Sequence, residues 1–96
     1  MMGDEDLARQ ILATFLSETP SQLESIRAAV AAADFKAAQR LAHTLKGAGA
    51  NLSSERFRAA ASSLELACKA LEAAMIESAA RQLVERFNEL SVAMRE

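Results

Sequence analysis

A histidine followed by a lysine at the third position and then by a glycine is the most chemically suggestive spacing in this sequence. His43 is the only histidine, and Lys46 and Gly47 follow it. In a helix these three residues would share one face. Imidazole is mostly neutral at pH 7, so one ring nitrogen is available as a nucleophile. A neighbouring lysine can neutralise a phosphoryl group, and phosphoryl transfer asks a protein chiefly for positioning and charge neutralisation.

The segment that carries these residues has the pattern of an amphipathic helix. Its apolar residues recur at helical spacing, and the opposite face is polar. Gly47 costs about 1 kcal/mol of helix propensity relative to alanine, which is understandable if the backbone of a partner must approach there. The predicted solvent-facing set is Lys36, Gln39, Arg40, His43, Lys46, Gly47 and Ala50.

Less specific explanations fit the same residues. A single histidine on a helix can be an ordinary surface or core residue, and the cations around it can be a solvated face. Gly47 or Gly49 can be the left-handed residue that ends a helix. A metal site is disfavoured, because His43 and the only cysteine, Cys68, lie on different predicted helices and offer no ligand set. A Ser-His-Asp triad has no supporting constellation.

Composition places the chain among small all-α domains. Its 96 residues suffice for a single domain, 1–96, and 51% of them are apolar although only 4% are aromatic. The apolar filler is alanine, leucine and methionine, which favour helices, and no run alternates between apolar and polar residues as a half-buried strand would. Residues 1–3 are expected to be a disordered start.

Charge and cysteine content limit which classes of partner and which cellular compartment fit this chain. The net charge is −2 with interspersed signs and no aromatic platform, which argues against nucleic acid. No apolar run approaches the ~18 residues of a membrane span and no signal peptide is visible, so no membrane contact is expected. A single cysteine cannot form an internal disulfide, which suits a reducing cytoplasm.

The predicted architecture is an antiparallel (up-down) four-helix bundle with an additional short N-terminal helix. The first helix covers 4–17. A second is predicted to begin at Thr19, where Pro20 takes the first helical position and Gln22 completes a capping box. Asp34 is the expected cap of the third helix, which carries the histidine. Five helices in one chain suffice for a bundle, so a monomer is expected.

Two further helices complete the predicted bundle. Ser53 or Ser54 is expected to cap the fourth helix, and a turn at 71–74 is expected to separate it from the last one. The last helix follows the alternating four- and three-residue steps of a bundle seam up to Met94. Predicted core-facing residues include Leu7, Ile11, Leu12 and Phe15 in the first helix, and Phe57, Ala60, Ala61, Leu64, Cys68 and Leu71 in the fourth.

Residues 41–52, which read Leu-Ala-His-Thr-Leu-Lys-Gly-Ala-Gly-Ala-Asn-Leu, resemble the signature of histidine-containing phosphotransfer (HPt) domains. The resemblance spans nearly the whole chain. It extends to the lead-in at 15–20 with Leu23, to 34–36 at the start of the histidine helix, and to the Leu-Glu pair at 64–65. It implies a four-helix bundle that receives a phosphoryl group from the aspartate of a receiver domain and returns it to another receiver.

The resemblance also implies roles for individual residues. His43 would be the phosphorylated nucleophile, Lys46 would neutralise the phosphoryl charge, and Gly47 would give the receiver access. Glu65 would hold Nδ1–H of the histidine ring so that Nε2 attacks, or it would be a solvated surface carboxylate.

Partners follow from the same resemblance. Gln39 and Arg40, one turn before the histidine, would help to position or attract the receiver, or Arg40 would be only a surface charge. The implied partners are response-regulator receiver domains, a hybrid sensor histidine kinase, or both. The domain would have no cofactor of its own, because no Gly-rich phosphate loop and no spare acidic cluster is present, and Mg²⁺ would sit on the receiver. It would be cytoplasmic, either free or as a cytoplasmic domain of a membrane-bound hybrid kinase.

Other functions stay open on the sequence alone. A helical adaptor or dimerisation module with an incidental histidine would bind through exposed apolar positions. The phosphotransfer domain of a chemotaxis-type kinase has a similar His-x-x-Lys-Gly-x-x-Gly pattern, with ATP of the kinase as phosphoryl donor. The dimerising histidine domain of a sensor kinase is disfavoured, because Thr44 rather than an acidic residue follows His43 and no proline comes soon after.

The chain departs from the family pattern in its connections. The family often has glycine where this chain has Ala33, and again near Leu71, and it usually has glycine after the leucine that here precedes Ser53. These differences put the geometry of the loops in question rather than the site.

Overall fold

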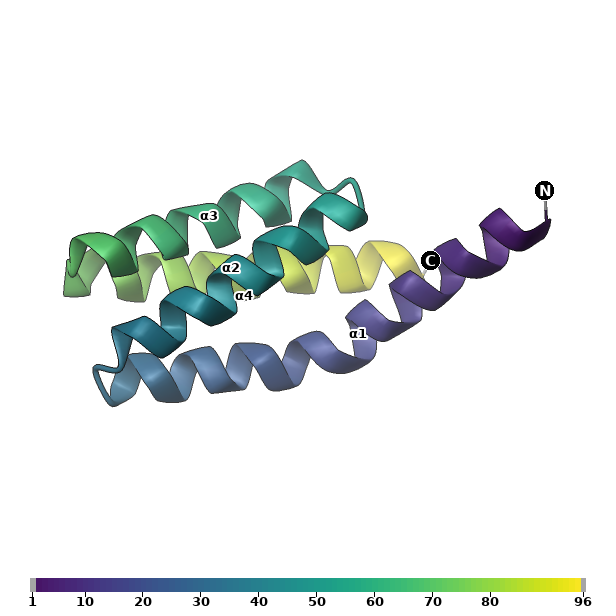
Figure 1. Cartoon of the computed structure of the whole chain (residues 1–96). Helices are drawn as coiled ribbons and strands as arrows, with labels where there is room; N and C mark the ends of the chain where they lie inside the picture. Colours follow the sequence, from purple (N-terminus) through teal and green to yellow (C-terminus); the bar gives the residue numbers. More distant parts are fainter. Residues whose placement is uncertain (1, 96) are drawn as a thin grey trace.

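The computed structural model describes the backbone of residues 2–95 and the side chains of residues 6–93, and it confirms the all-α prediction. Of the expected disordered start, residues 2 and 3 begin the first helix, and residue 1 lies outside the described part. The helices form an antiparallel bundle (Figure 1) because short connections fold each one back on the last. They are α1 (Met2–Ala31), α2 (Phe35–Asn51), α3 (Glu55–Ala70) and α4 (Ala73–Arg95).

The predicted break between a short N-terminal helix and the next helix is wrong. α1 continues through Pro20, so the expected extra helix is the first half of α1. Proline removes one backbone N–H and crowds the preceding turn, but Phe15 before it and Leu23 after it are both buried on one continuous helical stripe. Burial of that stripe outweighs the local stop signal. In Figure 1 the N-terminal part of α1 bends relative to its second half and extends past the C-terminal end of α4.

The N-caps of α2 and α3 follow the sequence prediction. The Asp34 carboxylate accepts a hydrogen bond from the Ala37 backbone N–H at 3.2 Å. The Ser54 hydroxyl accepts one from the Phe57 backbone N–H at 3.4 Å, so Ser54 rather than Ser53 caps α3. The turn between α3 and α4 lies at 71–72, inside the predicted range.

Each of the three connections contains one non-glycine residue in the left-handed region. These residues are Ala33 (φ 59°), Ser53 (φ 57°) and Leu71 (φ 56°). They stand where the HPt resemblance would place glycine, so the chain keeps a turn geometry that glycine adopts without strain. The prediction that Leu71 faces the core is wrong: α3 ends before it, and its side chain is exposed.

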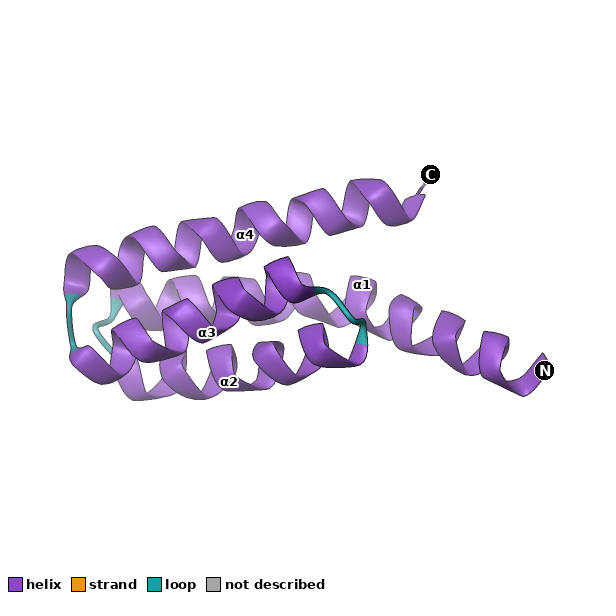
Figure 2. Cartoon of the chain, turned by 90° about the horizontal axis from the view of Figure 1, so that it is seen from above, coloured by secondary structure: helices purple, strands orange, loops and turns teal. Residues whose placement is uncertain are grey.

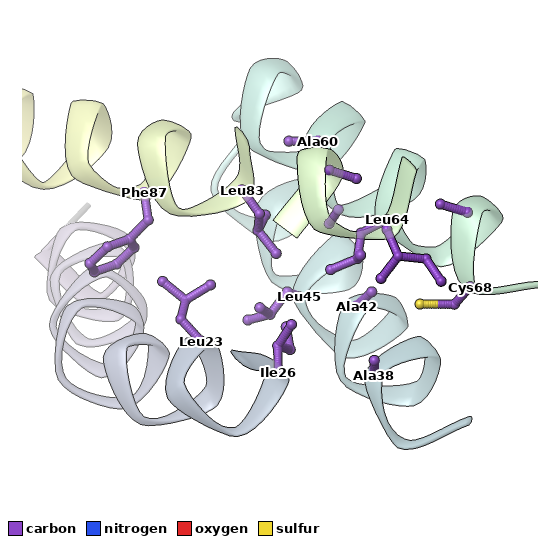
Figure 3. Close-up of a cluster of buried hydrophobic side chains, with 14 of the residues drawn as sticks. Leu23, Ile26, Ala38, Ala42, Leu45, Ala60, Leu64, Cys68, Leu83 and Phe87 are labelled. Carbon is purple, nitrogen blue, oxygen red and sulfur yellow. The ribbon is translucent and has the colours of Figure 1, made fainter. Parts of the chain in front are cut away.

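The core runs along the bundle and consists of leucine, alanine, isoleucine and phenylalanine side chains from all four helices (Figure 3). Leu45, Leu64 and Phe57 are completely buried. The ring of Phe15 meets that of Phe57 edge-on at 5.2 Å between centroids and that of Phe87 at 5.4 Å. These aromatic contacts tie α1 to both α3 and α4.

The beginning of α1 is less covered than its apolar pattern predicts. Leu7 and Ile11 were expected to face the core, but both are exposed, and Leu12 is only half-buried. The reason is geometric, because this part of α1 projects beyond the ends of the neighbouring helices (Figure 2). A helical stripe is buried only where another element lies opposite it.

The four seams of the bundle are unequal. α2 and α3 pack against each other most extensively, and α1 and α4 least. Since the helices follow one another around the bundle, the α1–α4 seam lies on the side opposite the α2–α3 seam (Figure 2). The candidate site belongs to the closed α2–α3 seam.

Candidate functional site

His43 lies in the middle of α2 and points outward. Its side chain is 67% exposed, whereas Ala42 before it and Leu45 two residues later are completely buried. Because these apolar neighbours hold α2 in a single rotation about its axis, the imidazole is presented to solvent without any loop to position it. The predicted solvent-facing stripe of α2 is thus confirmed at its centre.

A carboxylate from α3 holds the ring. Glu65 Oε2 lies 2.8 Å from His43 Nδ1. A carboxylate only accepts hydrogen bonds, so Nδ1 carries the proton and donates it, and Nε2 keeps its lone pair. No other side chain in the described part of the chain bonds the ring. The arrangement therefore defines both the orientation of the imidazole and the nitrogen that can act as nucleophile.

The same carboxylate also binds the lysine. Glu65 Oε1 lies 2.7 Å from Lys46 Nζ, so one carboxylate joins the two polar residues of α2. Only 8% of the Glu65 side chain is exposed, against 31% of the Lys46 side chain. Glu65 is therefore not the solvated surface carboxylate that the sequence left open. The ammonium of Lys46, helped by the ring of His43, outweighs burial and lowers the pKa of Glu65 below its ordinary value.

The two glycines of α2 have different surroundings. Neither has a positive φ, and α2 continues to Asn51, so the idea that one of them ends the helix is wrong. A Cβ on Gly49 would lie 2.9 Å from the backbone nitrogen of Arg58 and 3.1 Å from the Phe57 ring. A Cβ on Gly47 would meet nothing within 4 Å. Gly49 thus serves the contact between α2 and α3, whereas nothing within the chain requires glycine at position 47.

The remaining predicted residues stay outside this cluster. Arg40 is exposed and Gln39 half-buried on the polar face of α2. Among the described residues, neither side chain bonds His43, Lys46 or Glu65. The backbone carbonyl of Arg40 accepts a hydrogen bond from the Thr44 hydroxyl, one turn later, at 3.1 Å. This interaction is internal to α2.

The Lys46–Glu65 ion pair is the feature that sequence reasoning missed. The sequence predicts Lys46 either as a partner for a phosphoryl group or as part of a solvated face, not as an ion-pair partner of Glu65. The signal was available, because in antiparallel helices a carboxylate opposite His43 also lies within reach of a long side chain one turn away. Within the described residues no group of three His, Cys, Asp or Glu side chains could hold a metal ion.

Comparison with known protein families identifies the family of this chain, which the geometry of the site alone does not. A family model described as Hpt domain matches residues 10–93, which include α2, α3 and every residue of the site. The chain belongs to the Hpt domain family. Comparisons with curated proteins and with solved structures find no match.

Membership of the Hpt family defines the function at a coarse level. Hpt domains carry out histidine phosphotransfer in two-component phosphorelays and interact with receiver domains and kinases. No helix in the described part of this Hpt domain is both long and apolar enough to cross a membrane. The geometry around the ring nitrogen is compatible with that chemistry, because an exposed imidazole is oriented from behind by a buried carboxylate.

Proposed function

We propose that His43 is the phosphorylated residue, that it accepts a phosphoryl group from the aspartyl phosphate of a receiver domain, and that it passes the group to a second receiver. The observation that carries this proposal is the exposure of His43 combined with the bond from its Nδ1 to Glu65. A nucleophile must be both reachable and in the correct tautomer, and this arrangement satisfies both conditions.

The transfer step consumes no reactant other than the two proteins and the phosphoryl group that they exchange. The Nε2 lone pair of His43 attacks phosphorus, the P–N bond forms, and the P–O bond to the receiver aspartate breaks. The aspartate leaves with the bonding electron pair as a carboxylate. Nδ1 keeps its proton, so the phosphorylated ring carries positive charge, which the ionised Glu65 stabilises. The return step is the same reaction in reverse with another aspartate.

The neighbouring residues take complementary roles. Lys46, whose flexible stem lets its ammonium move from Glu65 toward the phosphoryl oxygens, neutralises their charge. Gly47 leaves space for the backbone of the receiver. Gln39 and Arg40 contact the receiver beside its acidic site, where the receiver holds its own Mg²⁺. The Hpt domain contributes half of an active site that is complete only in the complex. We place this complex in the cytoplasm, with the domain free or linked to a hybrid kinase.

The decisive experiment follows a radioactive phosphoryl group from phosphorylated receivers onto the wild-type chain and onto His43→Gln. The wild type should gain acid-labile, base-stable phosphate, and His43→Gln should gain none while keeping its circular dichroism and melting temperature. Gln82→Ala, an exposed change on α4, is the matched control and should be labelled normally.

Three outcomes would contradict the proposal. Normal labelling of His43→Gln would show that another residue is the acceptor. Labelling of wild type only by a kinase with ATP, and by no receiver, would assign the chain to the chemotaxis-type arrangement instead. Partner binding that survives His43→Gln without any labelling of the wild type would favour the adaptor function.

A further inference from the structure

The loosest seam of the bundle contains an apolar groove of about 790 Å³ between α1 and α4. Leu23 and Ile26 of α1 and Phe87 of α4 form its floor, and Val84 stands on its α4 wall with 40% of its surface exposed. The groove lies between α1 and α4, and this pair of helices is on the side opposite the α2–α3 pair (Figure 2), so a molecule bound there would leave the phosphotransfer site accessible.

The charges along the two rims differ. On α1, Glu24 and Arg27 pair with each other at 2.5 Å. On α4, Glu77, Arg81 and Glu85 are spaced four residues apart along one exposed stripe, and no ion pair within the described residues involves them. The α4 rim therefore presents a cation flanked on both sides by carboxylates that have no partner in the described part of the chain.

Arg81 and Glu85 of this stripe are self-complementary, whereas Glu77 would face the carboxylate of Glu89 in the same pairing. When two copies of a helix pair antiparallel about a two-fold axis, residue i of one faces residue j of the other, and i and j exchange roles across the axis. With the axis level with Leu83, Arg81 faces Glu85 of the second copy and Glu85 faces its Arg81. The two Val84 side chains then lie within about 3 Å of each other along the helix direction, at 1.5 Å of rise per residue. Apolar contact at the centre is flanked by two ion pairs.

We infer that the α1–α4 groove is the interface of a symmetric homodimer in which α4 packs antiparallel against α4 of a second copy. The expectation of a monomer rested on five helices in one chain sufficing for a bundle; the α1–α4 seam is the least closely packed of the four. The dimer carries two Hpt sites that face away from the two-fold axis. This inference is independent of which receivers donate and accept the phosphoryl group.

Sedimentation equilibrium on the full chain from about 1 μM to 1 mM tests the inference over the affinity range of weak and moderate dimers. We expect the mass to rise with concentration from 10.3 kDa toward twice that value. Arg81→Glu places carboxylates opposite carboxylates and should weaken the dimer by about tenfold or more. Glu85→Arg places cations opposite cations and should do the same.

The charge-reversed double variant distinguishes a specific interface from loss of folding. Arg81→Glu combined with Glu85→Arg restores opposite charges across the axis and should return the dissociation constant to near the wild-type value. All variants should keep the wild-type circular dichroism and the wild-type labelling by receivers. A mass of 10.3 kDa at every concentration would overturn the inference and leave the groove to solvent or to a helix of another protein. Equal dimerisation of all variants would overturn this placement of the interface.

Discussion

At the scale of single residues, Glu65 determines the chemistry of the site because it serves two donors at once. Its oxygens lie 2.8 Å from His43 Nδ1 and 2.7 Å from Lys46 Nζ. A buried carboxylate with two such donors is stabilised in its ionised form, and its pKa is lowered. The ring therefore has one hydrogen bond within the chain before any partner arrives, while the lysine can exchange Glu65 for a phosphoryl group.

The lowered pKa predicts a pH dependence of stability. A group whose pKa is depressed by folding stabilises the native state above its ordinary pKa of 4.5, and that contribution is lost as the pH falls through the lower native value. Glu65→Gln should reduce the free energy of unfolding at pH 7 by about 1–2 kcal/mol. Urea unfolding from pH 7 to below pH 4 should show the difference from wild type shrinking with acidification. A difference that is independent of pH would contradict the prediction.

The glycines of α2 give a matched pair of predictions. Gly47→Ala meets nothing within the chain, so it should raise stability by up to about 1 kcal/mol through helix propensity and yet slow transfer from a receiver. Gly49→Ala places a Cβ 2.9 Å from the Arg58 backbone and should destabilise the chain by about 1–3 kcal/mol. Urea unfolding and transfer rates measure both. A wild-type rate of phosphoryl transfer in Gly47→Ala would contradict the proposal that Gly47 leaves space for the receiver.

At the scale of helices and connections, long-range burial and local backbone preference oppose each other at several points. α1 continues through Pro20 because Phe15 and Leu23 on either side are both in the core. The connections turn at Ala33, Ser53 and Leu71 in the left-handed region that glycine prefers. In each case the packing of the helices maintains a local conformation that the residue itself disfavours.

Those left-handed residues predict stabilising substitutions. Ala33→Gly and Ser53→Gly should each raise the free energy of unfolding by about 1 kcal/mol, because the left-handed conformation costs roughly 1–2 kcal/mol for a residue with a Cβ. Ala32→Gly, the adjacent residue without a positive φ, is the control and should be destabilising because it only adds freedom to the unfolded chain. Urea unfolding distinguishes them, and equal effects at 32 and 33 would contradict the strain argument.

At the scale of the whole molecule, one core serves all four helices while the seams differ in closure. The aromatic contacts of Phe15 with Phe57 and Phe87 connect α1 to α3 and α4. The closed α2–α3 seam positions the site, and the open α1–α4 seam leaves an apolar groove on the other side. This division gives the molecule a closely packed face that carries the site and a separate face on which, by our inference, a second copy packs.

The shared core predicts which substitutions destabilise the chain most. Phe57→Ala removes a completely buried ring and should cost about 3–5 kcal/mol, a large part of the ~5–15 kcal/mol by which domains are stable. Leu66→Ala, on the same helix but exposed, should change stability by no more than about 0.5 kcal/mol. Thermal and urea unfolding compare the two. Similar losses for both would mean that the core does not centre on Phe57.

Sequence alone determined the features that depend on neighbours within a few residues. The helical period placed His43 on the outer face of α2, and short-range hydrogen bonds placed the caps at Asp34 and Ser54. The motif at 41–52 indicated the family, which the match over residues 10–93 confirmed. These features were readable because a helix repeats every 3.6 residues and a cap involves only its own first turn.

Tertiary structure alone decided what depends on residues far apart in the chain. Whether Pro20 ends a helix, whether Leu7 is covered, and which glycine meets another backbone all depend on which element lies opposite. The joining of His43 and Lys46 by Glu65 likewise needs the register of α2 against α3. Propensity acts through adjacent residues, whereas burial and ion pairing act through space, and where the two disagreed, packing prevailed.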